Sequence, residues 1–182
     1  MSKVTDFNAD LARSQTPAIH AAIWKAISAR EPEALAIYPA HPENDRIGVD
    51  YWVEYPNGRM EGLDVKIRSK DYLHKDPRTA FIELVANTRT GKLGWTVDPT
   101  KRTEKVLFYY ADTDRHVLYD ARQLRNAVNV YREYLSQVGI PETTTTKSYN
   151  GSYDSSGLIV AHCDLMRCIV NNSRSAPINK PE

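Results

Sequence analysis

A predicted β-hairpin at residues 47–68 limits the folds open to this chain more than any other stretch. Its sequence is IGVDYWVEYPNGRMEGLDVKIR, and two runs rich in Val, Ile, Tyr and Trp flank a Pro-Asn-Gly turn at 56–58. Asn-Gly between apolar runs is the strongest short-range signal for a hairpin. Charged residues interrupt both strands, with Asp50 in the first and Asp64 and Lys66 in the second. Because aspartate is depleted in strands, two of them flanking one turn need a specific reason.

The length of the turn decides whether these three side chains share a face. Asp64 and Lys66 are two residues apart on one strand, so both point to the same side. A two-residue loop sets Asp50 opposite Val65, with its side chain on the other face. A three-residue loop that extends to Arg59 sets Asp50 opposite Lys66 and on its face. We adopt this second register as a hypothesis, because it gathers two carboxylates and an amine in one layer of side chains.

Two interpretations fit such a layer. It can be an exposed sheet face that carries cross-strand ion pairs, each of them weakly stabilising. It can also be a divalent-metal site, in which hard oxygen ligands hold Mg²⁺ while the lysine positions or deprotonates a water molecule. Spacing alone leaves both open.

The hairpin resembles the core of the PD-(D/E)xK nuclease superfamily, which includes restriction-endonuclease-like and Holliday-junction-resolvase-like members, phage-type proteins among them. Asp50 matches the first acid, Asp64 the second acid and Lys66 the lysine, whereas Val49 stands where the motif's name has Pro. The resemblance implies metal-dependent hydrolysis of DNA phosphodiester bonds. Asp50, Asp64 and the backbone carbonyl of Val65 would bind Mg²⁺ or Mn²⁺, and Lys66 would orient or deprotonate the attacking water.

Glu83 lies inside a third predicted strand, TAFIELVA at 79–86. An ionised carboxylate on an apolar strand is costly unless it is paired or bound to a metal. In the resembled superfamily, an acidic or amide residue on the strand after Asp-x-Lys often completes the metal site, so the resemblance makes Glu83 a further catalytic and metal-binding candidate. The alternative is a salt bridge from Glu83 to Lys66 or Arg68 on the neighbouring strand.

Positive charge follows the candidate site along the chain. From Lys66 to Lys105, ten Lys or Arg residues stand against five Asp or Glu, a local balance of +5 in a chain of net charge +1. A groove for a phosphate backbone needs such a segment, although a charge-mixed surface also accounts for it. Trp95, within it, is either a base-stacking or a core residue. We expect nucleic-acid contacts from Arg68, Lys70, Lys75, Arg89, Lys92, Trp95, Lys101 and Arg102.

The order of predicted elements indicates an α/β fold, a mixed central β-sheet flanked by helices. The resemblance implies that this sheet is a restriction-endonuclease-like core. We expect one nuclease-like domain at 16–170, between a flexible arm at 1–15 and a disordered tail at 171–182.

Local signals predict several elements within this domain. A helix begins after Thr16 and ends near Arg30, and a second helix at 121–138 begins with a capping box at Asp120. The apolar run at 106–111 is typical of a strand buried on both faces. Residues 141–156 are predicted as a loop, followed by a short strand at 157–161.

Composition and motifs argue against several classes of protein. The chain has no apolar run of 18 residues, so we expect no membrane-spanning helix. Its N-terminal stretch lacks the apolar core of a secretory signal, so we do not expect secretion. Free thiols at Cys163 and Cys168 favour a reducing cytoplasm. Dinucleotide-binding and phosphate-loop glycine motifs are absent, and a net charge of +1 does not suit a DNA mimic.

Two other functions stay open beside a DNA nuclease. One is a nuclease-like module that binds DNA or a protein partner without cutting, such as a phage counter-defence protein. The other is a metal-independent hydrolase that uses Asp50 and Asp64 as an acid/base pair. A homodimer is possible, since many proteins of the resembled superfamily act as dimers.

Overall fold

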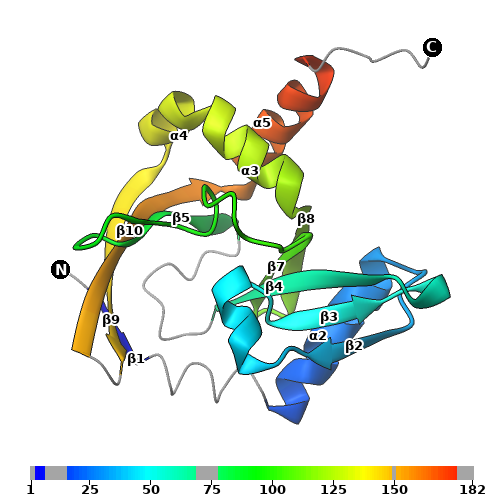
Figure 1. Ribbon diagram of the computed structural model, residues 1–182. Coiled ribbons are helices and arrows are strands. Elements are labelled where there is room, and N and C mark those ends of the chain that lie inside the picture. The colour runs from blue at the N-terminus through cyan, green and yellow to red at the C-terminus, as the bar shows by residue number, and fades with distance from the viewer. Residues whose placement is uncertain (1–2, 7–15, 69–77, 149–150, 176–182) are drawn as a thin grey trace.

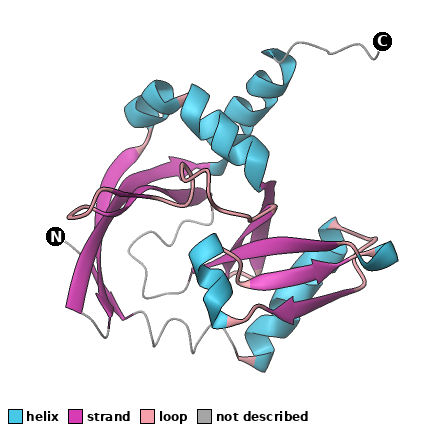
Figure 2. Cartoon of the chain, in the orientation of Figure 1, coloured by secondary structure: helices cyan, strands magenta, loops and turns pink. Residues whose placement is uncertain are grey.

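Two mixed β-sheets organise the computed structural model, which describes residues 3–6, 16–68, 78–148 and 151–175 (Figure 1). The first sheet has the strand order β1-β9-β10-β5-β6 and the second β2-β3-β4-β7-β8. Each contains one parallel pair, β1 with β9 and β4 with β7, while the other pairs are antiparallel. The α/β class with mixed sheets and flanking helices is confirmed, but the strands divide between two sheets instead of forming one central sheet (Figure 2).

The strands of the first sheet are β1 (Lys3–Asp6), β9 (Ile140–Ser148), β10 (Gly151–Ala161), β5 (Thr79–Asn87) and β6 (Lys92–Leu93). Those of the second are β2 (Ala36–Pro39), β3 (Tyr51–Glu54), β4 (Met60–Arg68), β7 (Lys105–Tyr110) and β8 (Arg115–Asp120). The helices are α2 (Pro17–Arg30), α3 (Ala121–Val130), α4 (Arg132–Val138) and α5 (His162–Ser175), with 3-10 turns η1 (Pro42–Ile47) and η2 (Pro56–Gly58).

Helix α2 packs against the second sheet. Its start is fixed as predicted, because the Thr16 hydroxyl accepts a hydrogen bond from the Ile19 N–H and Pro17 occupies the first turn. The helix buries an apolar stripe against strands β2, β3, β4 and β7, in a core that includes Ile23, Ile27, Val53, Leu63 and Leu107. This core covers the face of the β3–β4 hairpin that is turned toward α2.

A second core lies between the first sheet, β7, β8 and helices α3, α4 and α5. Asp120 caps α3 by accepting from the Gln123 N–H at 2.7 Å, which confirms the predicted start. The predicted single helix breaks at Tyr131 (φ −103°, ψ 23°), so α3 and α4 are separate. The central members of this core are Ile82, Phe108, Leu124, Leu135, Leu158 and Leu165.

Strand β7 belongs to both cores. Leu107 packs on the α2 side, whereas Val106, Phe108 and Tyr110 alternate with it and pack on the other side. All residues from Val106 to Tyr110 are buried, as the continuous apolar run predicts. The two halves of the molecule therefore share one strand.

A buried polar network joins α5 to strands β7 and β8. His162, at the start of α5, lies with its ring nitrogens 2.6 Å from the hydroxyls of Tyr110 and Tyr119. The Tyr110 hydroxyl donates in turn to the backbone carbonyl of Thr79. Hydrogen bonding compensates these polar groups for the loss of water.

Three segment predictions are corrected by the structure. Residues 141–148 and 151–156, which belong to the segment predicted as a loop, lie in strands β9 and β10, and the β-branched Thr run at 143–146 suits an extended backbone. Residues Lys3–Asp6 of the predicted arm form β1, which pairs in parallel with β9. Helix α5 continues to Ser175, so the first five residues of the predicted tail are helical.

Candidate functional site

The hairpin of β3 and β4 has a three-residue turn, although not the one we predict from the sequence. Strand pairing runs from Glu54 opposite Met60 to Tyr51 opposite Leu63, with η2 as the turn. Asn57 and Gly58 both adopt positive φ, 67° and 70°, a conformation that these two residue types tolerate. The turn therefore lies one residue earlier than in our preferred register.

Strand pairing ends with Tyr51 opposite Leu63, and Asp50 is the residue just before β3. The Asp50 N–H donates to the Leu63 carbonyl at 2.9 Å, one residue out of step with this pairing, so Asp50 lies beside Leu63 and not opposite Lys66. Asp50 nevertheless lines the same pocket as Asp64 and Lys66, so it lies on the predicted face. The shared face is thus correct, and the predicted partner across the strands is wrong.

Asp50, Asp64 and Lys66 meet on the side of the second sheet that faces away from α2. Asp64 is only 3% exposed, and its Oδ1 lies 2.8 Å from the Lys66 ammonium. Asp50 Oδ2 accepts a hydrogen bond from the Val65 N–H at 2.7 Å. Leu63 and Val65 alternate with the charged residues and pack toward α2, which leaves Asp64 and Lys66 pointing toward the first sheet.

Burial and mutual charge set the electrostatics of this cluster. Burial and then the negative charge of Asp64 raise the pKa of Asp50 to about 7. For Lys66, burial lowers the pKa, but the charges of Asp64 and Asp50 together outweigh it and hold the pKa above the ordinary value. The cluster is thus a crowded pair of acids with one charged amine beside it.

Glu83 reaches the same region from the other sheet. It lies on β5, and its Oε2 accepts from the Trp95 N–H at 3.4 Å. Burial raises its pKa, while the nearby charge of Lys66 opposes that rise. The alternative interpretation, a salt bridge to Lys66 or Arg68 on a neighbouring strand, does not apply, because β4 and β5 belong to different sheets. Glu83 instead faces Lys66 across the pocket between the sheets.

The turn after β6 holds Glu83 and Lys66 in place. The Trp95 ring lies 5.0 Å from the Lys66 ammonium and 6.2 Å from the Phe108 ring, so it serves both the core and the site. A Cβ on Gly94 would lie 2.1 Å from the Glu83 carbonyl oxygen, so only glycine allows this turn to approach β5. The Thr96 hydroxyl donates to that same carbonyl.

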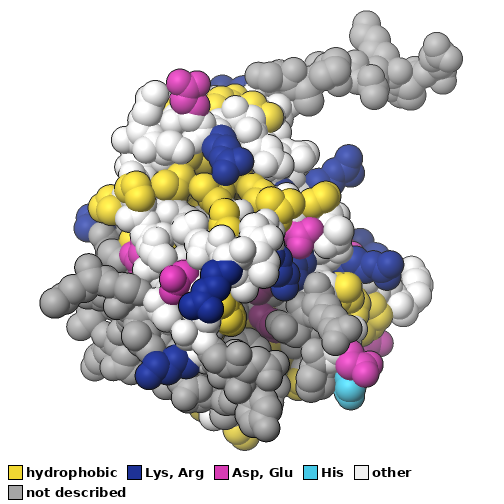
Figure 3. Space-filling view, turned by 60° about the vertical axis from the view of Figure 1, so that its left-hand side comes forward, with side chains coloured by type: hydrophobic (Ala, Val, Ile, Leu, Met, Phe, Trp, Pro, Cys, Tyr) yellow, Lys and Arg dark blue, Asp and Glu magenta, His cyan; other side chains and the backbone are white. Residues whose placement is uncertain are grey.

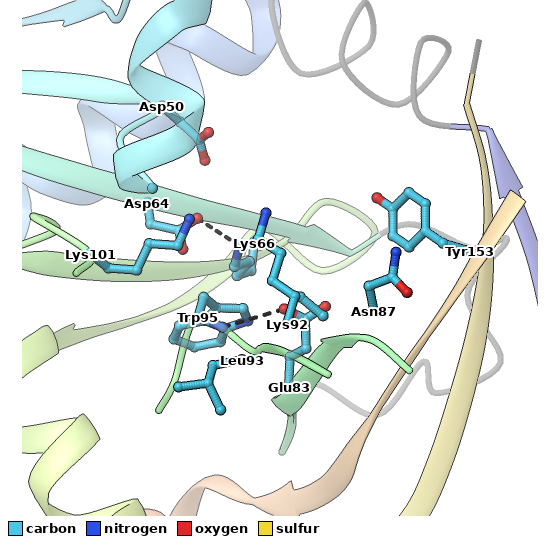
Figure 4. Close-up of a pocket in the computed structure, with 12 residues that line it drawn as sticks. Asp50, Asp64, Lys66, Glu83, Asn87, Lys92, Leu93, Trp95, Lys101 and Tyr153 are labelled. Carbon is cyan, nitrogen blue, oxygen red and sulfur yellow. Dashed lines mark hydrogen bonds and ion pairs between the residues drawn. The ribbon is translucent and has the colours of Figure 1, made fainter. Parts of the chain in front are cut away.

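These side chains line a pocket of about 390 Å³ between the two sheets (Figure 4). The acids and Lys66 lie at the second sheet, and residues of β5, β6 and β10 face them. Its lining consists of Gly48, Asp50, Asp64, Lys66, Glu83, Ala86, Asn87, Lys92, Leu93, Trp95, Lys101 and Tyr153. All four predicted catalytic residues therefore open into one pocket.

The predicted metal ligands are only partly gathered. Within the ranges that the structure describes, no three His, Cys, Asp or Glu side chains form a group able to hold a metal ion. Asp50 and Asp64 are adjacent, whereas Glu83 approaches from the opposite sheet. The donor set that the hairpin itself supplies is therefore the Asp50–Asp64 pair.

The predicted nucleic-acid residues separate into three groups. Lys92, Trp95 and Lys101 line the pocket, whereas Arg89 and Arg102 are exposed and outside its lining. Lys70, Lys75 and the side chain of Arg68 lie outside the described part of the chain. On the face shown in Figure 3, the described Lys and Arg side chains are interspersed with Asp and Glu and do not form one continuous basic surface.

Sequence reasoning misses two polar residues of the pocket, Asn87 and Tyr153. Asn87 ends β5, and only its position four residues after Glu83, on the same strand face, hints at a shared location. Tyr153 lies in the segment predicted as a loop, where no periodicity points to a site. Both come from the first sheet.

Comparison with protein-family models, with curated proteins and with solved structures gives no match. Among the described residues, no helix is both long and apolar enough to cross a membrane.

Proposed function

We propose that this pocket hydrolyses phosphodiester bonds of DNA with the help of Mg²⁺ or Mn²⁺. The observation that carries the proposal is the convergence of Asp50, just before β3, and Asp64 of β4 in one pocket, with the Lys66 ammonium 2.8 Å from Asp64 Oδ1. Acid, acid and lysine in this order on a hairpin are also what the resemblance to PD-(D/E)xK nucleases rests on. That resemblance stays a prediction.

The residues present suit a divalent cation. Two carboxylates lie side by side in a buried setting, and hard cations prefer such oxygen ligands. Asp50 and Asp64 would hold the ion, and the Val65 carbonyl and Glu83 are the further donors that the resemblance implies. When bound, the ion supplies a Lewis acid that stabilises the charge developing on the phosphate.

In the proposed reaction, Lys66 would act on the attacking water or on a phosphate oxygen. Its ammonium lies against Asp64 and the Trp95 ring, which limits its freedom and keeps it charged. In the reaction, the water oxygen forms a bond to phosphorus and the bond from phosphorus to one bridging oxygen breaks. The leaving oxygen takes up a proton, and the water gives up one, so one water molecule is consumed for each bond cut.

The test is incubation of the protein with supercoiled, linear and branched DNA in Mg²⁺, Mn²⁺ or EDTA. We expect cutting in either metal and none in EDTA, and Asp64→Asn should cut at least about 100-fold more slowly. Asp114→Asn is the matched control, because Asp114 is an exposed partner of Lys25 away from the pocket. Cutting by Asp64→Asn at the wild-type rate would refute the assignment, and cutting in EDTA would favour a metal-independent acid/base pair.

A second candidate function is binding without cutting. It is favoured by the place of Glu83 on the opposite sheet, across the pocket from Asp50 and Asp64. In that case DNA or a protein partner would still bind, no substrate would be cut in any metal, and Asp64→Asn would leave the affinity unchanged. A homodimer and a cytoplasmic location stay predictions.

A further inference from the structure

The pocket has a second wall that the proposed hydrolysis does not use. Tyr153 of β10 and Asn87 of β5 lie beside each other, across the pocket from Asp50 and Lys66 (Figure 4). Neither residue belongs to the acid and lysine cluster. The first sheet therefore presents an aromatic ring and an amide to whatever the second sheet's acids act upon.

Asn87 is oriented by its own turn. Its Oδ1 accepts hydrogen bonds from the N–H groups of Arg89 and Thr90, at 3.0 and 3.2 Å. These two bonds fix the amide oxygen toward the turn, so the amide NH₂ is the part of the side chain available to the pocket. A fixed NH₂ group is a donor suited to an acceptor on the edge of a base.

Tyr153 is the aromatic ring on the wall that faces the acids and Lys66. The Trp95 ring lies against Lys66 itself and packs beside Phe108. Tyr153 comes from the opposite sheet and lines the pocket with its ring. Tyrosine rings stack on bases of any sequence, because every base has a π-face.

The depth of the site limits the form of the substrate. Asp64 is 3% exposed, so a phosphate must enter the pocket to reach it. A volume of about 390 Å³ is that of a small-ligand site and not of a groove that spans a duplex. A paired duplex holds its bases stacked inside, whereas an unpaired strand can place one nucleotide between the two sheets.

We propose that the pocket receives an unpaired nucleotide, with its base against Tyr153 and Asn87 and its phosphate beside Asp50, Asp64 and Lys66. This proposal rests on the proposed hydrolysis of DNA and names its substrate class as single-stranded or locally unpaired DNA. Lys92 and Lys101, which also line the pocket, contact the phosphates on either side.

Binding without cutting tests the proposal directly. Wild-type protein in EDTA is titrated into a fluorescein-labelled DNA strand of about 12 nucleotides, and into its blunt duplex, with anisotropy as the readout. We expect tighter binding of the single strand. Tyr153→Ala should weaken that binding about tenfold, whereas Tyr153→Phe, which keeps the ring, should change it less than about twofold.

Two further variants make the test specific. Tyr38→Ala removes an exposed tyrosine from β2, outside the pocket, and should leave both affinities unchanged. Asn87→Asp keeps the acceptor for Arg89 and Thr90 but replaces the NH₂ donor with a charged oxygen, and should weaken single-strand binding as strongly as Tyr153→Ala.

The outcomes separate this proposal from the hydrolysis on which it rests. Equal affinity for strand and duplex, with no effect of Tyr153→Ala, overturns the unpaired-nucleotide pocket even if the protein cuts duplex DNA in Mg²⁺. Tyr153-dependent binding of the single strand, with no cutting in any metal, supports the pocket and refutes the hydrolysis. Faster cutting of single-stranded or frayed DNA than of blunt duplex, lost in Tyr153→Ala, supports both.

Discussion

Asp50 and Asp64 form a carboxylate pair that costs the folded protein stability. Both are removed from water, and the pair is crowded enough to raise the pKa of Asp50 to about 7, first through burial and then through the charge of Asp64. Lys66 offsets part of this cost through its ion pair with Asp64. A buried arrangement with two acids and one amine is poor for stability, and the cation that we propose would offset its excess negative charge.

We predict that Asp50→Asn stabilises the protein in EDTA by about 1–3 kcal/mol in the free energy of unfolding. The substitution removes the repulsion, while the amide oxygen still accepts the hydrogen bond from the Val65 N–H. Urea unfolding at neutral pH measures the effect. Asp114→Asn, at an exposed ion pair, should change the stability by less than about 0.5 kcal/mol.

The same variant reports on the metal. Added Mg²⁺ should raise the unfolding temperature of the wild-type protein, because a ligand that binds only the folded state stabilises it. Asp50→Asn should lose that increase. If Mg²⁺ stabilises both proteins equally, the Asp50–Asp64 pair is not the cation site.

At the scale of residues, periodicity explains what the sequence could predict. Asp64 and Lys66 share a face in any register, because they are two residues apart on one strand. In a regular hairpin, Asp50 shares that face in the predicted register and in any register shifted from it by two residues. The partner of Asp50 depends on which residues form the turn, and the turn is Pro56–Gly58, with Asn57 at positive φ, and does not extend to Arg59. Tyr153 could not be found, and Asn87 only through its spacing from Glu83, because no local pattern relates residues of the first sheet to the acids of the second.

At the scale of elements, the turn at Gly94 links the site to strand β5. The Gly94 N–H donates to the Leu84 carbonyl at 2.9 Å, and the next two residues contact Glu83. We predict that Gly94→Ala destabilises the protein by about 3 kcal/mol, because a Cβ 2.1 Å from a backbone oxygen forces the turn away from β5.

Gly91→Ala provides the matched control for this prediction. Gly91 has positive φ (68°), and a Cβ at this position would meet no other atom within 4 Å, so the substitution should cost only about 1 kcal/mol of backbone strain. Urea unfolding followed by tryptophan fluorescence gives both values. Equal costs for the two variants would show that the close approach at Gly94 is not important for stability.

Elements with strong local signals were predictable, and elements defined by distant partners were not. Thr16 and Asp120 cap their helices through side-chain oxygens, and the run in β7 is apolar throughout, so local sequence suffices. Strand β9 instead carries a polar threonine run without apolar alternation. Its extended form depends on β1 and β10, which pair with it on both sides.

At the scale of the whole molecule, the division into two sheets follows from the place of β5. In sequence, β5 stands between β4 and β7, but β4 and β7 pair directly in parallel while β5 pairs with β10. The sequence therefore predicted one central sheet, because local patterns do not say which strands are neighbours. The pocket exists because β5 lies in the other sheet and faces β4 across a gap.

Strand β7 makes the two sheets one folding unit. Leu107 lies in the core beneath α2, and its neighbour Phe108 lies in the core beneath α3 and α5. Neither core keeps its packing if β7 leaves the second sheet. We therefore predict one cooperative unfolding transition for the described residues, and not a separate transition for each sheet.

Two of the three tryptophans can report on the two cores separately. Trp24 packs against the core beneath α2, and Trp95 packs against the other core. In a protein that keeps only Trp24 and in one that keeps only Trp95, with Phe at the other positions, fluorescence and far-UV circular dichroism should give the same urea midpoint. If Trp24 and circular dichroism instead report different midpoints in the same variant, the sheets unfold independently. The pocket between them would then open without global unfolding, and the nucleotide that we propose as its ligand would have a second route into it.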